Sequence, residues 1–256
     1  MIKEESRFEA STVFEGMTSI RALIDNLKAD VKNARKINKI LFDNSKSKSK
    51  FKEIGYLKKM AELFSFEIEG VDSSVIDGFT VGNSHGGIIA LCQEREYDTL
   101  QSELITPNGF YVMLEGIEDP YNFGYALRSI YASGADGIVL SKRNWLSAAG
   151  VVCRSSAGAS ERLNILIADD DFIEIFKKKG YKVVCADIKN SVSVYDADLK
   201  KPIFLIVGGE KRGISASILK EADQIIRIDY GRSFDAALSA ASASTILAFE
   251  IFRNNK

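Results

Sequence analysis

The 256 residues carry a net charge of −1, and 46% of them are hydrophobic and 27% charged, as in a soluble globular protein. No apolar run approaches the ~20 residues that a membrane span needs, and the first residues, MIKEESRFEA, contain no apolar signal core. Three scattered cysteines and a single histidine argue against a disulfide framework and against a zinc site. We therefore expect a cytoplasmic protein that has no metal site and no membrane partner.

The first hundred residues alternate between helical and strand patterns. Apolar residues recur at helical spacing over 20–27, and a second helix is predicted over 54–64. Three short strands are expected at 37–43, 66–71 and 88–92. This order predicts a small α/β domain over 1–100. The polar stretch 97–103 predicts a linker to a second domain over 105–256.

The second half contains apolar runs that are separated by helical patterns. The strands are expected at 110–114, 137–140, 163–168, 182–188, 202–208 and 224–228. The helices are expected at 125–133, 148–156, 171–180, in a short stretch from Ile214, and at 238–253. Continuous apolar strands that alternate with helices predict an α/β fold with a mostly parallel sheet covered on both faces.

The charge is unevenly distributed along the chain. Residues 28–59 contain eleven lysines and arginines but only three acidic residues. Such a cluster is either a solvated helical face and loop or a surface that contacts phosphates, where clustered lysines gain from counterion release. The candidate phosphate contacts are Arg35, Lys36, Lys39, Lys46, Lys48 and Lys50, together with Arg154 outside the cluster.

Several familiar catalytic and nucleotide-binding motifs are incomplete. Gly208 to Gly213 nearly form a phosphate loop, but Ile214 stands where that motif needs its lysine. A G-x-G-x-x-G motif is absent, so a dinucleotide site is disfavoured. His85 is the only histidine, which disfavours a serine–histidine hydrolase, and we interpret it as a structural residue. The Gly-Gly-Glu that follows strand 202–208 is also compatible with an ordinary turn.

Three polar loops follow predicted strands of the second half. They are IEDPYNFG (117–124), VGGEKRG (207–213) and IDYGRSFDAALSAAS (228–242). In an open α/β sheet the carboxyl ends of the strands form the edge where ligands bind. Proline restricts the backbone of Asp119-Pro120, so this turn should be rigid. We expect Asn122 to orient polar groups there and Arg128 to point back toward the same pocket.

The same segments resemble the signature motifs of the SpoU/TrmH family of RNA 2′-O-ribose methyltransferases, which belong to the SPOUT class. IEDPYNFGYALRSIYASGADGIVL (117–140) resembles the first motif, and FLIVGGEKRGIS (204–215) resembles the second. IRIDYGRSFDAALSAASASTILAFEIFR (226–253) is similar to the third, and CRSSAGASERLNI (153–165) is similar to the family's Arg-x-Ser-x-Gly-Ala segment.

The resemblance implies a carboxyl-terminal domain with a trefoil knot, preceded by an RNA-binding domain similar to small ribosomal proteins. It also implies a homodimer whose sites are completed by the partner chain, S-adenosylmethionine as cofactor, and structured rRNA or tRNA as substrate. The implied cofactor-binding residues are Leu205, Gly208, Glu210, Ile226, Ile228, Leu238 and Ser239. The implied catalytic residues are Asn122, Arg128 and Glu210.

Two features of the motifs bear on the chemistry. A guanidinium keeps its proton in proteins, so we expect Arg128 to stabilise the developing alkoxide or to grip a phosphate instead of acting as a base. The third motif has Ala237-Leu238-Ser239 where active relatives carry Ser-Leu-Asn, and its loop is about one residue longer. Ser239 should recover one hydrogen bond, and Ser233 or Asp235 could supply another.

The departure in the third motif leaves three hypotheses open. The chain is a methyltransferase, an RNA-binding protein of the same fold that has lost methyl transfer, or an unrelated α/β metabolic enzyme. The first predicts RNA-dependent use of the cofactor, the second predicts RNA binding through the lysine cluster, and the third predicts neither.

Overall fold

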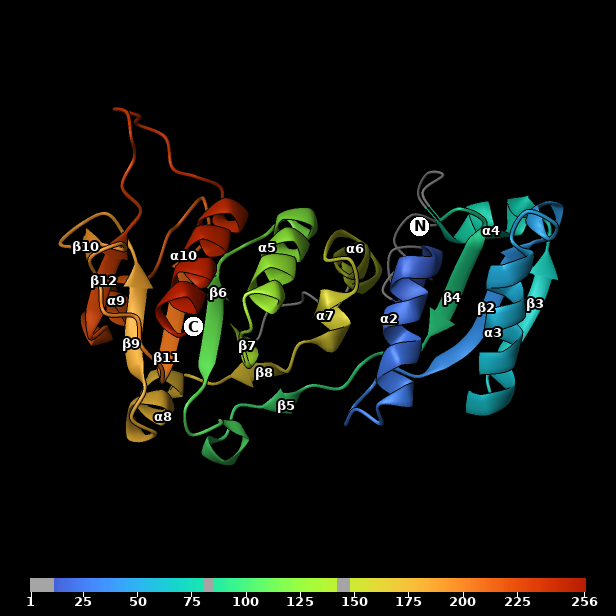
Figure 1. The fold of residues 1–256 in the computed structure, drawn as a ribbon, viewed down its shortest axis with the longest axis horizontal. Coiled ribbons are helices and arrows are strands. Elements are labelled where there is room, and N and C mark those ends of the chain that lie inside the picture. The colour runs from blue at the N-terminus through green and yellow to red at the C-terminus, as the bar shows by residue number, and fades with distance from the viewer. Residues whose placement is uncertain (1–11, 81–84, 142–147) are drawn as a thin grey trace, which may run out of the picture. The chain divides into compact units, whose positions relative to one another are not determined.

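The computed structural model describes residues 12–80, 85–141 and 148–256, which form two compact units (Figure 1). Unit 1 contains the described residues up to Glu96 together with 148–162, and unit 2 contains 97–141 and 163–256. Residues 148–162 belong to unit 1 by their contacts, contrary to the expectation that they lie in the second domain. The irregular segment 142–147, with Trp145, lies outside the described residues.

Unit 1 is built on a four-stranded mixed sheet in the order β1-β4-β2-β3. Strand β4 runs antiparallel to both β1 and β2, and β2 runs parallel to β3. The strands are β1 (Val13–Glu15), β2 (Ile37–Asp43), β3 (Glu67–Val71) and β4 (Ile88–Cys92). The helices are α2 (Gly16–Lys28), η2 (Asn44–Lys46), α3 (Phe51–Phe64), α4 (Ser73–Phe79), α6 (Ala149–Ser155) and α7 (Ala159–Arg162).

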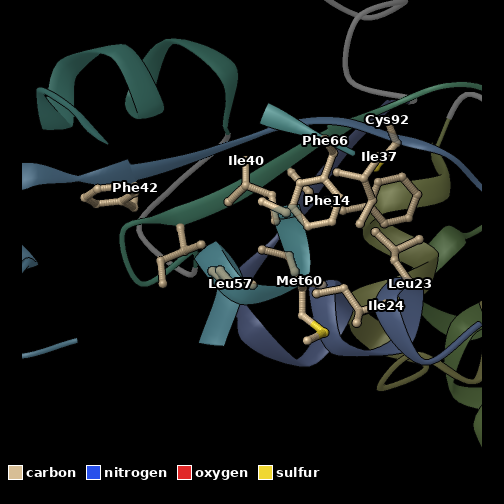
Figure 2. Packing of buried hydrophobic residues seen from close by; sticks show 14 of the residues in the cluster. Phe14, Leu23, Ile24, Ile37, Ile40, Phe42, Leu57, Met60, Phe66 and Cys92 are labelled. Atoms are coloured by element: carbon tan, nitrogen blue, oxygen red, sulfur yellow. The ribbon is translucent and has the colours of Figure 1, made fainter. Parts of the chain in front are cut away.

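One apolar core joins the sheet of unit 1 to α2 and α3. Figure 2 shows Leu23 and Ile24 of α2 and Leu57 and Met60 of α3 facing strand residues such as Ile40. These side chains occur at helical spacing on one face of each helix, which explains why both helices form where the apolar pattern predicts them. Cys153 of α6 is fully buried in the same core, although 110 residues of sequence separate it from β2.

Three contacts hold the segment 148–162 within unit 1. Gly158 has a φ of +85°, and a Cβ there would lie 2.5 Å from the Cβ of Ala22, so only glycine allows this approach. The Nη1 atom of Arg154 lies 2.6 Å from an Oε2 atom of Glu15. Glu161, which is 2% exposed, accepts hydrogen bonds from the equally buried Arg35.

Unit 2 is built on an eight-stranded sheet in which every pair is parallel, in the order β10-β12-β9-β11-β6-β7-β8-β5. Its strands are β5 (Asp98–Thr99), β6 (Phe110–Glu115), β7 (Gly137–Ser141), β8 (Ile165–Ala168), β9 (Lys182–Ala186), β10 (Val192–Ser193), β11 (Ile203–Gly208) and β12 (Gln224–Arg227). Its helices are η3 (Ser102–Leu104), α5 (Pro120–Ala132), α8 (Phe172–Lys178), α9 (Ala216–Glu221) and α10 (Ala240–Asn254).

Helices cover the parallel sheet because its strands are apolar on both faces. Phe176 of α8 stacks on Phe204 of β11, with ring centroids 3.9 Å apart. Leu205 points to the opposite face, where α10 packs on β11 and on α5 (Figure 1). The predicted α/β class with its large parallel sheet is therefore confirmed, whereas the trefoil knot stays a prediction.

Some predicted elements need correction. The stretch 97–103 is not only a linker, because β5 pairs with β8 and forms an edge of the large sheet. Neither β1 nor α4 was predicted, since each is short and has too few apolar residues to show a period. None of the described helices is long and apolar enough to cross a membrane.

Candidate functional site

The register of unit 2 brings the three signature loops to one edge of the sheet. Leu114 of β6 pairs with Val207 of β11, Val207 pairs with Ala186 of β9, and Ala186 pairs with Ile226 of β12. These four residues form one row across neighbouring parallel strands. The first, second and third motif loops leave the sheet just beyond this row. The predicted meeting of the loops at the carboxyl edge is confirmed.

The first loop is fixed by the side chain that precedes its proline. Asp119 caps α5, and its two carboxylate oxygens accept hydrogen bonds from the backbone N–H groups of Tyr121 (3.2 Å) and Asn122 (3.1 Å). Pro120 occupies the first turn of the helix, where a missing N–H leaves no bond unmade. The backbone of Asn122 is thus held, and its side chain remains free to reach across the edge of the sheet.

The second loop depends on glycine for close contact between backbones. A Cβ at Gly208 would lie 2.4 Å from the carbonyl carbon of Gly213, and one at Gly209 would lie 2.2 Å from the carbonyl oxygen of Gly116. The N–H of Gly209 donates to the carbonyl oxygen of Glu115, and the N–H of Gly213 donates to that of Gly209. The Gly-Gly-Glu sequence therefore specifies a turn that docks on the first loop.

These two loops bring Asn122 and Glu210 together. The Nδ2 atom of Asn122 donates to Oε1 of Glu210 at 3.3 Å, across 88 residues of sequence. Both side chains line a hollow of about 110 Å³ whose other lining residues are Gly116, Ile117, Glu118, Asp119, Lys211 and Ala240. Lys211 lies 2.8 Å from an Oε2 atom of Glu118, and this hydrogen bond raises the pKa of Lys211.

Arg128 does not line the same hollow. It lies six residues after Asn122, so its side chain leaves α5 about 120° around the helix from that of Asn122. Its side chain is exposed on the same outward face as Tyr125 and Tyr121, which lie one and two turns earlier. Within the described residues it makes no hydrogen bond or ion pair. The expectation that Arg128 points back into the pocket of its own chain is therefore wrong.

The third loop contains no helix or strand between Arg227 and Ala240. Two hydrogen bonds from backbone N–H groups to side-chain hydroxyls hold it. The N–H of Leu238 donates to the hydroxyl of Tyr230 at 3.0 Å. Ser239 caps α10, and its hydroxyl accepts from the N–H of Ser242 at 3.1 Å. Tyr230 was not predicted as a site residue, and no spacing rule in the sequence singles it out.

The remaining predicted cofactor residues differ in exposure. Leu205 and Ile226 are fully buried within β11 and β12, whereas Gly208 and Ile228 are half-buried at the strand ends. Ser233 and Asp235, the possible substitutes in the third motif, are exposed and make no hydrogen bond within the described part of the chain. The structure thus brings Gly208 and Ile228 to the edge of the sheet and leaves Leu205 and Ile226 beneath it.

The predicted phosphate contacts of unit 1 fall into two groups. In the first group, Arg35 is buried against Glu161, Arg154 pairs with Glu15, Lys39 pairs with Glu67 and Glu69, and Lys46 lies 3.8 Å from Asp43. The hydrogen bonds that Lys39 donates to Glu69 and Glu67 raise its pKa. In the second group, Lys36, Lys48 and Lys50 make no ion pair within the described residues. Because Arg35 is buried, its guanidinium is not accessible to a ligand.

Comparisons with known proteins agree with the motifs. A sequence model of the SpoU rRNA Methylase family matches residues 109–249, which is more than half of the chain. A Staphylococcus saprophyticus protein named for the TrmH family of tRNA/rRNA methyltransferases is 28% identical, and the match covers 89% of this chain and 92% of that protein.

Two solved structures share the fold. An AdoMet-bound rRNA methyltransferase from Sinorhizobium meliloti has a TM-score of 0.78 at 23% identity, covering 98% of this chain and 94% of that one. An RNA 2′-O ribose methyltransferase has a TM-score of 0.73 at 22% identity, covering 94% and 88%. At such identities the likeness establishes the architecture of the chain.

Proposed function

Because the chain belongs to the SpoU rRNA methylase family, we propose that it transfers a methyl group from S-adenosylmethionine to a ribose 2′-hydroxyl of structured RNA, either rRNA or tRNA. The observation that carries the proposal is the Asn122–Glu210 pair, which two signature loops assemble at the carboxyl edge of the parallel sheet. The same edge binds ligands in other open α/β sheets. The assignment to the cytoplasm stays a prediction.

Two glycines leave backbone exposed on the loops at this edge. A Cβ at Gly116 or at Gly213 would meet no atom within 4 Å, so backbone is open to a ligand on both loops. We infer that Gly208, Ile228 and Leu238 hold the cofactor through backbone groups, with Leu205 and Ile226 as the apolar floor beneath them. Glu210 and Ser239 add polar contacts. When bound, S-adenosylmethionine supplies an electrophilic methyl group, and the protein's task is alignment and proton removal.

Asn122 and Glu210 have the chemistry for proton removal. A ribose hydroxyl must lose its proton as it attacks, and a carboxylate at hydrogen-bonding distance can accept it. The amide of Asn122 donates to one oxygen of Glu210, which leaves the second oxygen available to the substrate. We therefore assign the acceptor role to Glu210 and the orienting role to Asn122.

Arg128 would act in the site of a partner chain. Helices α5 and α10 pack side by side, with Thr245 donating to Ser129 at 2.7 Å. Their outward faces carry exposed aromatic side chains at Tyr121, Tyr125, Phe249 and Phe252. Exposed aromatic side chains on two neighbouring helices are typical of a protein interface. If this face forms the homodimer that the family resemblance implies, the guanidinium of Arg128 crosses to the partner and stabilises the alkoxide there.

The departure in the third motif keeps a second function in view. Ser239 replaces the family's asparagine, and its hydroxyl is engaged as the cap of α10. A protein of this fold that binds RNA without methylating it would fit that observation. Both functions predict RNA binding by unit 1, and only the methyltransferase predicts consumption of the cofactor.

The test is transfer of labelled methyl from S-adenosylmethionine to total RNA from a strain that lacks this gene. Digestion to nucleosides should then yield label in a 2′-O-methyl nucleoside. Glu210→Gln should abolish the transfer, whereas Glu174→Gln should not, because Glu174 is exposed on α8 and its ion pair is with Lys178 of the same helix. Recovery of label in a base-methylated nucleoside would refute the ribose assignment, and RNA binding without transfer would favour the second function.

A further inference from the structure

The first residue of α3 exposes an aromatic ring. Phe51 is 77% exposed, more than any other large apolar side chain that the structure describes. Its ring has no aromatic or cationic neighbour within the described residues. Tyr56 on the same helix is different, since Arg21 and Lys28 each lie 5.1 Å from its ring centroid. The ring of Phe51 is thus open on the surface of unit 1.

A glycine one turn further keeps the space beside this ring clear. Gly55 lies in the interior of α3, where glycine is unfavourable compared with alanine. No packing explains it, because a Cβ at Gly55 would meet no atom within 4 Å. A helical side chain leans toward the turn that precedes it, so any larger residue at position 55 would extend toward Phe51. The glycine therefore leaves a flat, open strip of helix next to the ring.

Lysines precede Phe51 in the sequence and follow it along α3. Lys48, Lys50, Lys52, Lys58 and Lys59 precede Phe51 or lie on α3, and none of them forms an ion pair within the described residues. Lys39 and Lys46 on the neighbouring β2 and η2, by contrast, pair with carboxylates of the same unit. These five lysines outnumber the two carboxylates of the same stretch, Glu53 and Glu62, so the stretch has a net positive charge that favours an external anion. The positive end of the α3 dipole adds to this field.

We propose that Phe51 is a stacking platform for one unpaired base of the RNA, with the unpartnered lysines contacting the phosphates on either side. This inference rests on the proposed function, because it assumes an RNA ligand. Every nucleobase has an apolar face that stacks on an aromatic ring, and interleaved lysines follow the backbone without reading sequence. Phe51 would bind an unstacked nucleotide, so the protein would prefer RNA loops and bulges to duplex RNA.

The test is binding of two labelled probes without cofactor: a 12-nucleotide single-stranded RNA of mixed sequence and the duplex formed with its complement. Phe51→Ala should weaken binding of the single strand by roughly 5- to 100-fold and leave duplex binding unchanged. Phe51→Trp should keep wild-type affinity. Leu63→Ala is the matched control, since Leu63 is 64% exposed near the other end of α3, about 18 Å away, and should change nothing.

Salt dependence separates stacking from charge. Lys52→Ala should lower the slope of log affinity against log salt by about one, whereas Phe51→Ala should leave the slope unaltered. Equal affinities of Phe51→Ala and wild type for the single strand, in a protein that methylates RNA, would overturn the platform and leave the proposed function intact. A wild type that neither binds nor methylates RNA would overturn both. A change in oligomeric mass on Phe51→Ala, with RNA affinity unaltered, would make this face a protein contact and also overturn the platform.

Discussion

Units 1 and 2 differ in what they do with their charged side chains. At the edge of the unit 2 sheet, Glu210 accepts from Asn122 and Lys211 pairs with Glu118, so the polar groups of the hollow are held in defined positions. On the surface of unit 1 the lysines around Phe51 have no partners within the described residues. Defined positions suit the alignment of reacting atoms, and unpaired charges suit the attraction of a polyanion. Under the proposed function, chemistry would therefore belong to unit 2 and RNA capture to unit 1.

Unit 1 also contains one ion pair whose partners are held in defined positions. Arg35 and Glu161 are both almost completely buried and form an ion pair with Nε and Oε2 3.3 Å apart. Glu161 belongs to the Arg-x-Ser-x-Gly-Ala segment, whose sequence resembles part of the methyltransferase domain. A buried pair of this kind fixes position because either partner alone would be an uncompensated charge. We infer that this pair anchors the family segment in unit 1.

The largest effect is expected from breaking that anchor. Glu161→Ala removes the buried carboxylate that faces the Arg35 guanidinium and should destabilise unit 1 by about 3–5 kcal/mol. Burial raises the pKa of Cys153 to about 12 and that of Cys185 to about 12, so each thiol reacts only when its own unit opens. Labelling with a thiol reagent, mapped by mass spectrometry, should therefore accelerate at Cys153 and remain slow at Cys185.

The matched control for this prediction is the neighbouring residue. Arg162 pairs with Asp25 at 2.9 Å on the surface, and such exposed pairs contribute about 0–1 kcal/mol. Arg162→Ala should barely change labelling at either cysteine. Equal acceleration of labelling at Cys153 and Cys185 in Glu161→Ala would mean that the two units open together. The expectation that the substitution destabilises unit 1 alone would then be wrong.

The next largest effect concerns catalysis in unit 2. Arg128→Lys keeps the charge but loses the planar fork, so methyl transfer should fall about 10²- to 10³-fold, which corresponds to about 2.7–4 kcal/mol of transition-state stabilisation. RNA affinity should stay within about threefold, because the proposed function assigns RNA capture to unit 1. Single-turnover transfer and a filter-binding assay measure the two quantities. Arg162→Lys is the control, and turnover close to wild type in Arg128→Lys would remove the catalytic role.

Much of the fold could be read from the sequence, because its elements show clear periods. Strands β2 and β4 begin and end where the apolar runs do, and α10 begins two residues after its predicted start. The meeting of Asn122 with Glu210 was also predictable, since parallel strands share a carboxyl edge. The burial of Arg35 was not. Its partner Glu161 lies 126 residues away in the sequence. The lysine-rich sequence around Arg35 gives no indication that this one basic side chain is buried.

The smallest expected effect tests whether Gly55 lowers the stability of unit 1 but favours RNA binding. Gly55→Ala should stabilise the protein by about 0.5–1 kcal/mol, because alanine is the better helix former and its Cβ meets no neighbour. Gly55→Gln should also be more stable than wild type, but its longer side chain would extend over the strip beside Phe51 and weaken binding of single-stranded RNA. Thermal unfolding and RNA titration of the two variants measure both effects. If both variants were more stable than wild type and bound RNA equally well, Gly55 would be needed neither for packing nor for RNA binding. The proposed role of this glycine would then be wrong.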